Sequence, residues 1–177
     1  MSTQAALERA EPIRLVIFDV DGVLTDGCLY LGNGGEELKA FNIKDGLGMK
    51  LLLNSGVEIG IITGRSSQLV ADRMESLGIR HVYQGQKEKL PAYEKLKAEL
   101  GLQDKQIAYV GDDLIDLPLM RRTGLSVAVA DAYVLVKEHA HWQTSLPGGQ
   151  GAAREVCELI MEAQGTLDAA LQPFLEA

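Results

Sequence analysis

Short runs of apolar, mostly β-branched residues alternate along the chain with longer stretches in which apolar residues recur at helical spacing. An uninterrupted apolar run is typical of a strand that is buried on both faces of a parallel sheet. Such runs predict strands at residues 15–18, 58–62, 81–83, 107–110, 126–130 and 142–144. The stretches between and after them predict helices at residues 45–54, 66–77, 88–100, 114–122, 133–138 and 154–164. This alternation indicates an α/β fold built on a doubly wound parallel sheet.

One segment departs from the alternation. Two short apolar segments, Cys28–Leu31 and Leu38–Ile43, flank the turn sequence Gly32-Asn-Gly-Gly35, which predicts a β-hairpin over residues 28–43. Apolar side chains fall on both faces of this ribbon, so it is expected to need a partner, which indicates oligomerisation. We expect a flexible leader at residues 1–12, a single domain at residues 13–165 and a C-terminal tail at residues 166–177.

Composition narrows the class of protein. A length of 177 residues suits one ordinary domain, and 46% hydrophobic with 24% charged residues is globular rather than disordered. The net charge of −8 argues against nucleic acids and anionic membrane surfaces as partners. Cys28 and Cys157 are far apart and are interpreted as small buried hydrophobic residues. Residues 1–11 lack a secretory apolar region and no membrane-spanning run is apparent, so a cytoplasmic location is expected.

Polar residues follow three of the predicted strands at the point where each strand ends. Asp19 and Asp21 follow the first, Thr63 the second and Asp112 with Asp113 the fourth. The carboxyl ends of parallel strands meet at one edge of the sheet, so these side chains are expected to lie together. Several carboxylates held close need a cation, and Mg²⁺ prefers oxygen ligands. The alternative for the Asp-Gly segment is an ordinary turn.

Several residues keep two interpretations. Lys89, at the start of a predicted helix, would neutralise Asp19 and a transferred phosphoryl group, and Lys87 is its less favoured rival, otherwise a solvated surface charge. Asp116 is either part of the acidic site or a helix-start charge favoured by the helix dipole. Three histidines match no motif and are interpreted as structural or surface residues: His81, His139 and His141. Trp142 is interpreted as a core residue.

The motif from Asp19 to Thr25, with Thr63, Lys89 and the segment 111–116, resembles the haloacid dehalogenase (HAD) superfamily of phosphotransferases. The resemblance implies a Rossmann-like core in which Asp19 is the nucleophile that forms an aspartyl-phosphate. It makes Asp21 the general acid and base, while Thr63 and Lys89 stabilise the phosphoryl oxygens. It implies that Mg²⁺ is bound by the Asp19 carboxylate, the Asp21 backbone carbonyl and Asp112. Asp113 would not bind the metal directly but would contact its ligands or a metal-bound water.

The intervals of about 40 residues before Thr63 and about 25 before Lys89 are too short to hold a separate cap domain. An open site needs a neighbouring subunit to exclude water. Segments 19–27, 35–46, 61–65, 83–86, 109–113, 129–132 and 148–156 resemble the 3-deoxy-D-manno-octulosonate 8-phosphate (KDO 8-phosphate) phosphatase family of lipopolysaccharide precursor synthesis. That family implies a capless homotetramer with sites at subunit interfaces. It also implies substrate contacts at Asp21, Asn42, Ile43, Lys44, Asp45, Gly46, Lys50, Gly64, Arg65, Arg73 and Lys89.

A phosphorylated sugar acid carries two anionic groups, and Lys44, Lys50, Arg65 and Arg73 would supply positive charge against the acidic background. Two positions depart from the family pattern: Lys50 stands where Arg is frequent, and Gln150 where a basic residue is common. Three alternatives remain. One is a phosphatase for a nine-carbon sialic-type sugar acid 9-phosphate, one a receiver-like phospho-acceptor domain, and one a silent oligomerisation module. The complete set of motif residues disfavours the last.

Overall fold

The computed structural model describes residues 3–176; Met1, Ser2 and Ala177 lie outside the described residues. A six-stranded sheet has the order β5-β4-β1-β6-β7-β8, and each neighbouring pair is parallel. Its strands are β1 (Leu15–Phe18), β4 (Glu58–Ile62), β5 (His81–Tyr83), β6 (Ile107–Gly111), β7 (Leu125–Ala128) and β8 (Trp142–Gln143). The doubly wound α/β sheet predicted from the pattern is confirmed.

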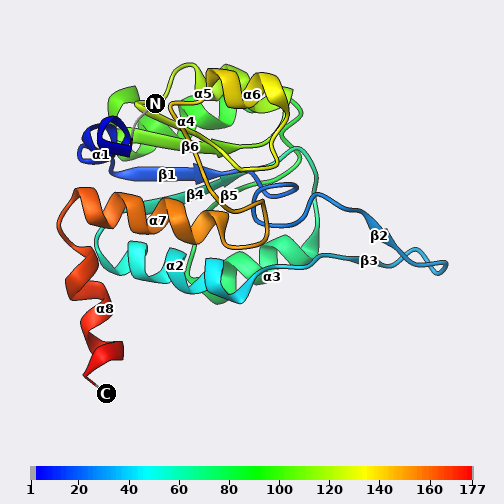
Figure 1. The fold of residues 1–177 in the computed structure, drawn as a ribbon. Coiled ribbons are helices and arrows are strands. Elements are labelled where there is room, and N and C mark those ends of the chain that lie inside the picture. Colours follow the sequence, from blue (N-terminus) through cyan, green and yellow to red (C-terminus); the bar gives the residue numbers. More distant parts are fainter. Residues whose placement is uncertain (1–2, 177) are drawn as a thin grey trace.

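Helices cover both faces of the sheet (Figure 1). One layer contains α1 (Thr3–Ala10), α2 (Ile43–Asn54), α3 (Gln68–Leu77) and α7 (Ala152–Ala163). The other contains α4 (Leu90–Leu100), α5 (Leu117–Met120) and α6 (Val134–His139), with short 3₁₀ turns at Asp104–Gln106 and Leu114–Asp116. Within residues 3–176, no helix has the length and apolar character needed to cross a membrane. Strands β1, β4, β6 and β7 are buried almost throughout, as continuous apolar runs require.

Both ends of the chain form helices, and the first of them contradicts the expected flexible leader. Most of the expected flexible leader forms α1, whose residues Ala6 and Ala10 are fully buried. A helix this short is marginal alone, so its packing against α7 and β7 stabilises it. The expected tail forms a further helix, α8 (Leu167–Leu175), which extends away from the sheet (Figure 1).

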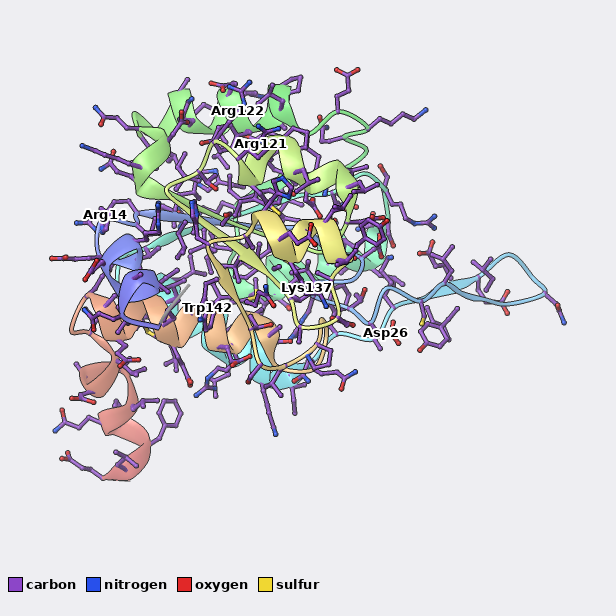
Figure 2. All side chains as sticks on the ribbon, turned by 45° about the horizontal axis from the view of Figure 1, so that its top comes forward. Arg14, Asp26, Arg121, Arg122, Lys137 and Trp142 are labelled. Atoms are coloured by element: carbon purple, nitrogen blue, oxygen red, sulfur yellow. The ribbon has the colours of Figure 1, made fainter. Side chains whose placement is uncertain are left out.

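The predicted hairpin is present, but its strands are shorter than expected. Strands β2 (Tyr30–Leu31) and β3 (Glu37–Leu38) pair antiparallel and project from the body (Figure 1). Leu31 is 70% exposed, and Cys28, predicted to be buried, is exposed. Asp26 lies where the ribbon leaves the body (Figure 2) and accepts hydrogen bonds from the Tyr30 hydroxyl and the Cys28 backbone N–H.

The start of α2 also corrects the sequence interpretation. Asn42, not Asp45, caps this helix, because its side chain accepts a hydrogen bond from the Lys44 N–H at 2.8 Å. Ile43 is therefore the first helical residue rather than the end of a strand. Asp45 is buried and instead accepts from the N–H groups of Gly151 and Arg154, at 3.3 and 2.9 Å, at the start of α7.

The residues outside the motifs have structural contacts. His81 lies 3.5 Å from Glu58, and His141 exchanges hydrogen bonds with Ser126. The His139 ring lies 2.8 Å from the Leu135 carbonyl. Trp142, on the edge strand β8, is partly buried against the core rather than enclosed in it (Figure 2).

Candidate active site

Three strand ends meet at one edge of the sheet. Asp19 directly follows β1, Thr63 follows β4 and Asp112 follows β6, which is the convergence that a parallel sheet with β1 between β4 and β6 produces. A cavity of about 240 Å³ opens there. It is lined by Asp19, Asp21, Gly27, Thr63, Gly64, Arg65, Asp112, Asp113 and Ile115.

Lys89 lies at the bottom of this arrangement, directly before α4. Its side chain is almost completely buried, with Nζ 2.8 Å from Oδ2 of Asp19 and 2.7 Å from Oδ1 of Asp116. Burial acts to lower the pKa of Lys89, but the charges of Asp116 and Asp19 outweigh it and raise that pKa. Lys87 is exposed, so the structure brings Lys89 rather than its rival to the acidic residues.

Asp116 is a member of the site and not simply a charge at the start of a helix. It is fully buried, and Oδ1 accepts hydrogen bonds from Lys89 and from the Tyr109 hydroxyl at 2.6 Å. Its Oδ2 accepts from the backbone N–H groups of Asp112 and Asp113, at 3.0 and 3.2 Å. Asp116 therefore fixes both the Lys89 ammonium and the loop that carries Asp112.

The acidic residues fit a divalent cation. Carboxylate oxygens of Asp19, Asp112 and Asp116 lie within 4.8 Å of one another. Oδ1 of Asp112 is buried and has no hydrogen-bond partner among residues 3–176. Burial and the charges of Asp116 and Asp19 raise the pKa of Asp112 to about 8. Burial, followed by Asp116, raises the pKa of Asp19 to about 6, against the opposing effect of Lys89.

The loop after β1 is shaped to admit the Asp112 carboxylate. Gly22 has a φ of +88°, and a Cβ atom there would lie 2.1 Å from Oδ2 of Asp112. The two carboxylates predicted to bind metal, those of Asp19 and Asp112, approach each other, whereas the Asp21 carboxylate contacts Lys39. The Asp21 backbone carbonyl as a metal ligand stays a prediction.

The Asp112→Asn substitution should separate the effect of the Asp112 carboxylate on folding stability from its role in binding Mg²⁺. We expect the Asp112→Asn variant, without divalent cations at pH 7.5, to melt about 2–8 °C above the parent, because on folding it need neither take up a proton nor bury a charge among other carboxylates. Millimolar Mg²⁺ should raise the melting temperature of the parent but not of the variant. Thermal unfolding with and without Mg²⁺ measures both, with Asp168→Asn on α8 as the control. An equal Mg²⁺ shift in all three proteins would contradict the site.

A family model described as haloacid dehalogenase-like hydrolase matches residues 79–155. The chain is 56% identical over 164 residues to 3-deoxy-D-manno-octulosonate 8-phosphate phosphatase KdsC of Yersinia pestis, across 93% of this chain and 88% of that protein. The chain belongs to the KDO 8-phosphate phosphatase family.

Solved structures of this phosphatase family superpose closely. The crystal structure of the Yersinia pestis phosphatase has a TM-score of 0.92 at 55% identity, covering 93% of this chain and 89% of that chain. The phosphatase of Moraxella catarrhalis, in complex with a magnesium ion, a phosphate ion and a KDO molecule, has a TM-score of 0.95 at 42% identity. The superposition covers 98% of this chain and 99% of that one. The resemblance drawn from the motifs is confirmed.

The phosphatase-family residues expected to bind substrate fall into two groups. Asp21, Gly64 and Arg65 line the cavity. Lys89 is buried next to it, in contact with Asp19. The others lie at the N-cap of α2, on α2 or on α3, and do not line it: Asn42, Ile43, Lys44, Asp45, Gly46, Lys50 and Arg73. Arg73 packs over Gly46, where a Cβ atom would lie 2.3 Å from its Nη2.

Three residues that contact the acidic residues of the site or their partners were not predicted from the sequence. Tyr109, in the middle of β6, reads as a core aromatic, yet its hydroxyl donates to Asp116. Glu37 and Lys39 read as parts of the hairpin, yet Lys39 contacts Asp21. A lysine and a glutamate separated by one residue in a strand share a face, and that spacing was the available signal.

Proposed function

We propose that this chain is a Mg²⁺-dependent phosphomonoesterase that hydrolyses KDO 8-phosphate to KDO and phosphate, in lipopolysaccharide precursor synthesis. The buried Asp19–Lys89–Asp116 arrangement at the edge of the sheet carries the proposal, because it holds a carboxylate nucleophile beside a fixed cation. The likeness to a phosphatase structure containing magnesium, phosphate and KDO supports the substrate and the metal.

The first half-reaction transfers the phosphoryl group to the protein. A carboxylate oxygen of Asp19 attacks phosphorus in line, and the bond from phosphorus to the 8-oxygen of the sugar acid breaks. Asp21 gives its proton to that leaving oxygen. The Thr63 hydroxyl and the Lys89 ammonium stabilise the phosphoryl oxygens. Mg²⁺, held by Asp19, Asp112 and the Asp21 carbonyl, with Asp113 one layer out, supplies further positive charge against those oxygens.

The second half-reaction returns the protein to its starting state. Water attacks the phosphorus of the aspartyl-phosphate, and the bond between phosphorus and Asp19 breaks. Asp21, now a carboxylate, takes the proton of the attacking water and regains the form that it had at the start. Phosphate and KDO leave, and Asp19 is again paired with Lys89.

We propose a homotetramer in which the hairpin of one subunit covers the site of another. The cavity is open, and the hairpin exposes Leu29, Leu31 and Leu38. Ile43 is 80% exposed, and Lys44 and Lys50 are exposed nearby on α2. Ile43, Lys44, Lys50 and Arg73 do not line the cavity of their own subunit and are suited to complete a neighbour's site. There, Lys44, Lys50 and Arg73 would bind the sugar-acid carboxylate. A multiply charged substrate does not cross a bilayer unaided, which supports a cytoplasmic enzyme.

Charging the ribbon should dissociate the assembly. We expect Leu31→Asp to shift the protein from tetramer to smaller species, because Leu31 is exposed in the single subunit and the variant would place a carboxylate in the proposed apolar contact between subunits. Light scattering after size exclusion reports the mass. The matched control, Asn33→Asp, adds the same charge at the hairpin turn without removing apolar area. A tetramer that survives Leu31→Asp would place the interface elsewhere.

Phosphate release in Mg²⁺ tests the proposed activity. KDO 8-phosphate should be preferred over a nine-carbon sugar acid 9-phosphate and over a sugar phosphate without a carboxylate, and chelation should abolish turnover. Preference for the nine-carbon acid would change the substrate and direct attention to Lys50 and Gln150. A long-lived aspartyl-phosphate without turnover would instead favour the receiver-like alternative.

A further inference from the structure

A closed ring of alternating charges joins the hairpin to the cavity. Lys39 follows β3 directly; its Nζ contacts Oδ1 of Asp21 and lies 3.2 Å from Oε1 of Glu37. Arg65 closes the ring, with Nη2 3.3 Å from Oε2 of Glu37 and Nε 3.9 Å from Oδ2 of Asp21. We call Asp21, Lys39, Glu37 and Arg65 the charge ring.

Lys39 differs from the other members of the charge ring in its burial. Its side chain is only 2% exposed, whereas those of Asp21 and Glu37 are about a quarter exposed and that of Arg65 about half exposed. An ammonium group is strongly hydrated, and its burial is costly unless carboxylates replace the lost water. Lys39 is therefore held in one place by Asp21 and Glu37, and it holds them in return.

We propose, resting on the proposed phosphatase function, that Lys39 is a positioning residue for the acid and base Asp21. By binding Oδ1, Lys39 fixes the rotation of the carboxyl group and leaves Oδ2 as the oxygen that gives and takes the proton. Oδ2 lies 3.9 Å from Nε of Arg65, which is beyond hydrogen-bond distance. Proton transfer depends steeply on such placement.

The same contacts make the hairpin part of the catalytic machinery. Lys39 and Glu37 both belong to the returning half of the ribbon, so the position of that strand sets the position of the Asp21 carboxyl group. Arg65, expected to bind the substrate, is held by Glu37 of the same strand. A displaced ribbon would thus misplace the acid and base together with a substrate-binding guanidinium.

The test compares two leaving groups in the Mg²⁺-loaded Lys39→Met variant. With KDO 8-phosphate, whose alkoxide needs a proton, we expect kcat to fall roughly 10–10²-fold. With p-nitrophenyl phosphate, whose leaving group needs none, phosphorylation of Asp19 should stay fast while its hydrolysis slows. A burst of nitrophenolate close to one per site should then precede slow turnover. Lys39→Arg should recover part of the lost rate.

Several outcomes would overturn the role. A proportional loss on both substrates without a burst would mean a merely structural lysine, and a raised KM with unchanged kcat would mean a substrate ligand. Melting temperature and mass, compared with Lys95→Met on the exposed face of α4, show whether the variant is folded and assembled. If the parent fails on KDO 8-phosphate but cleaves p-nitrophenyl phosphate, the substrate assignment fails while the burst still tests Lys39.

Discussion

Replacing Asp19 by Asn is expected to slow phosphate release by roughly 10⁴-fold or more, because the amide cannot form the covalent phosphoryl intermediate. The substitution preserves shape at a buried position whose carboxylate lies 2.8 Å from Lys89. Lys89 keeps its second partner, Asp116, so the fold should survive. Steady-state phosphate release and acid-quench detection of a phosphorylated protein measure the effect, and neither signal should appear.

A matched exposed carboxylate provides the control for this loss. Asp72→Asn on α3 makes the same chemical change at an exposed residue whose carboxylate accepts a hydrogen bond from Gln68 on the same helix. It should retain parental turnover. Activity above about one per cent in Asp19→Asn, once deamidation is excluded by mass spectrometry, would mean that another group is the nucleophile.

The Lys89→Met substitution is expected to damage both activity and stability. It leaves Asp19 and Asp116 buried without their shared cation, which costs about 3–5 kcal/mol and lowers the melting temperature by about 6–20 °C. The phosphoryl oxygens also lose a fixed positive charge, so kcat should fall roughly 10³-fold. Thermal unfolding and phosphate release give the two values separately.

A double variant separates the two effects of losing Lys89. Lys89→Met with Asp116→Asn removes one buried charge of each sign, so stability should return toward that of the parent. Turnover should stay low, because the Lys89 ammonium no longer faces the transferred group. If the double variant instead regains activity, Lys89 serves to neutralise Asp116 and not the phosphoryl group.

The strand ends and their acidic residues could be predicted because they depend on simple rules. Continuous apolar runs predict buried parallel strands, and parallel strands bring Asp19, Thr63 and Asp112 to one edge. The expected boundaries of the sheet strands and their flanking helices lie within two residues of those observed, except that the helix expected from residue 114 begins with a 3₁₀ turn and α5 itself starts at Leu117. Lys89 was distinguishable from Lys87 only through a motif, since both precede the same helix.

Interactions between distant segments escaped prediction. Asp45 has the residue type of a local helix cap, but it caps α7, more than a hundred positions away. The charge ring depends on which face of a short ribbon turns toward the cavity, and β3 has only two residues to establish that alternation. Helix α1 has a polar sequence and forms because two alanines fit against the core.

The position of β1 has a consequence for how the chain folds as it leaves the ribosome. This strand ends at residue 18, but it pairs with β4 and β6, and β6 extends to residue 111. Helix α1 packs against α7, which is not complete until residue 163 has been synthesised. This apolar strand is thus synthesised first and buried late. Pairing between strands far apart in the sequence is slow, and an apolar segment that stays exposed meanwhile is prone to aggregation. During synthesis, the nascent β1 segment is the part of this chain that a chaperone would have most reason to bind.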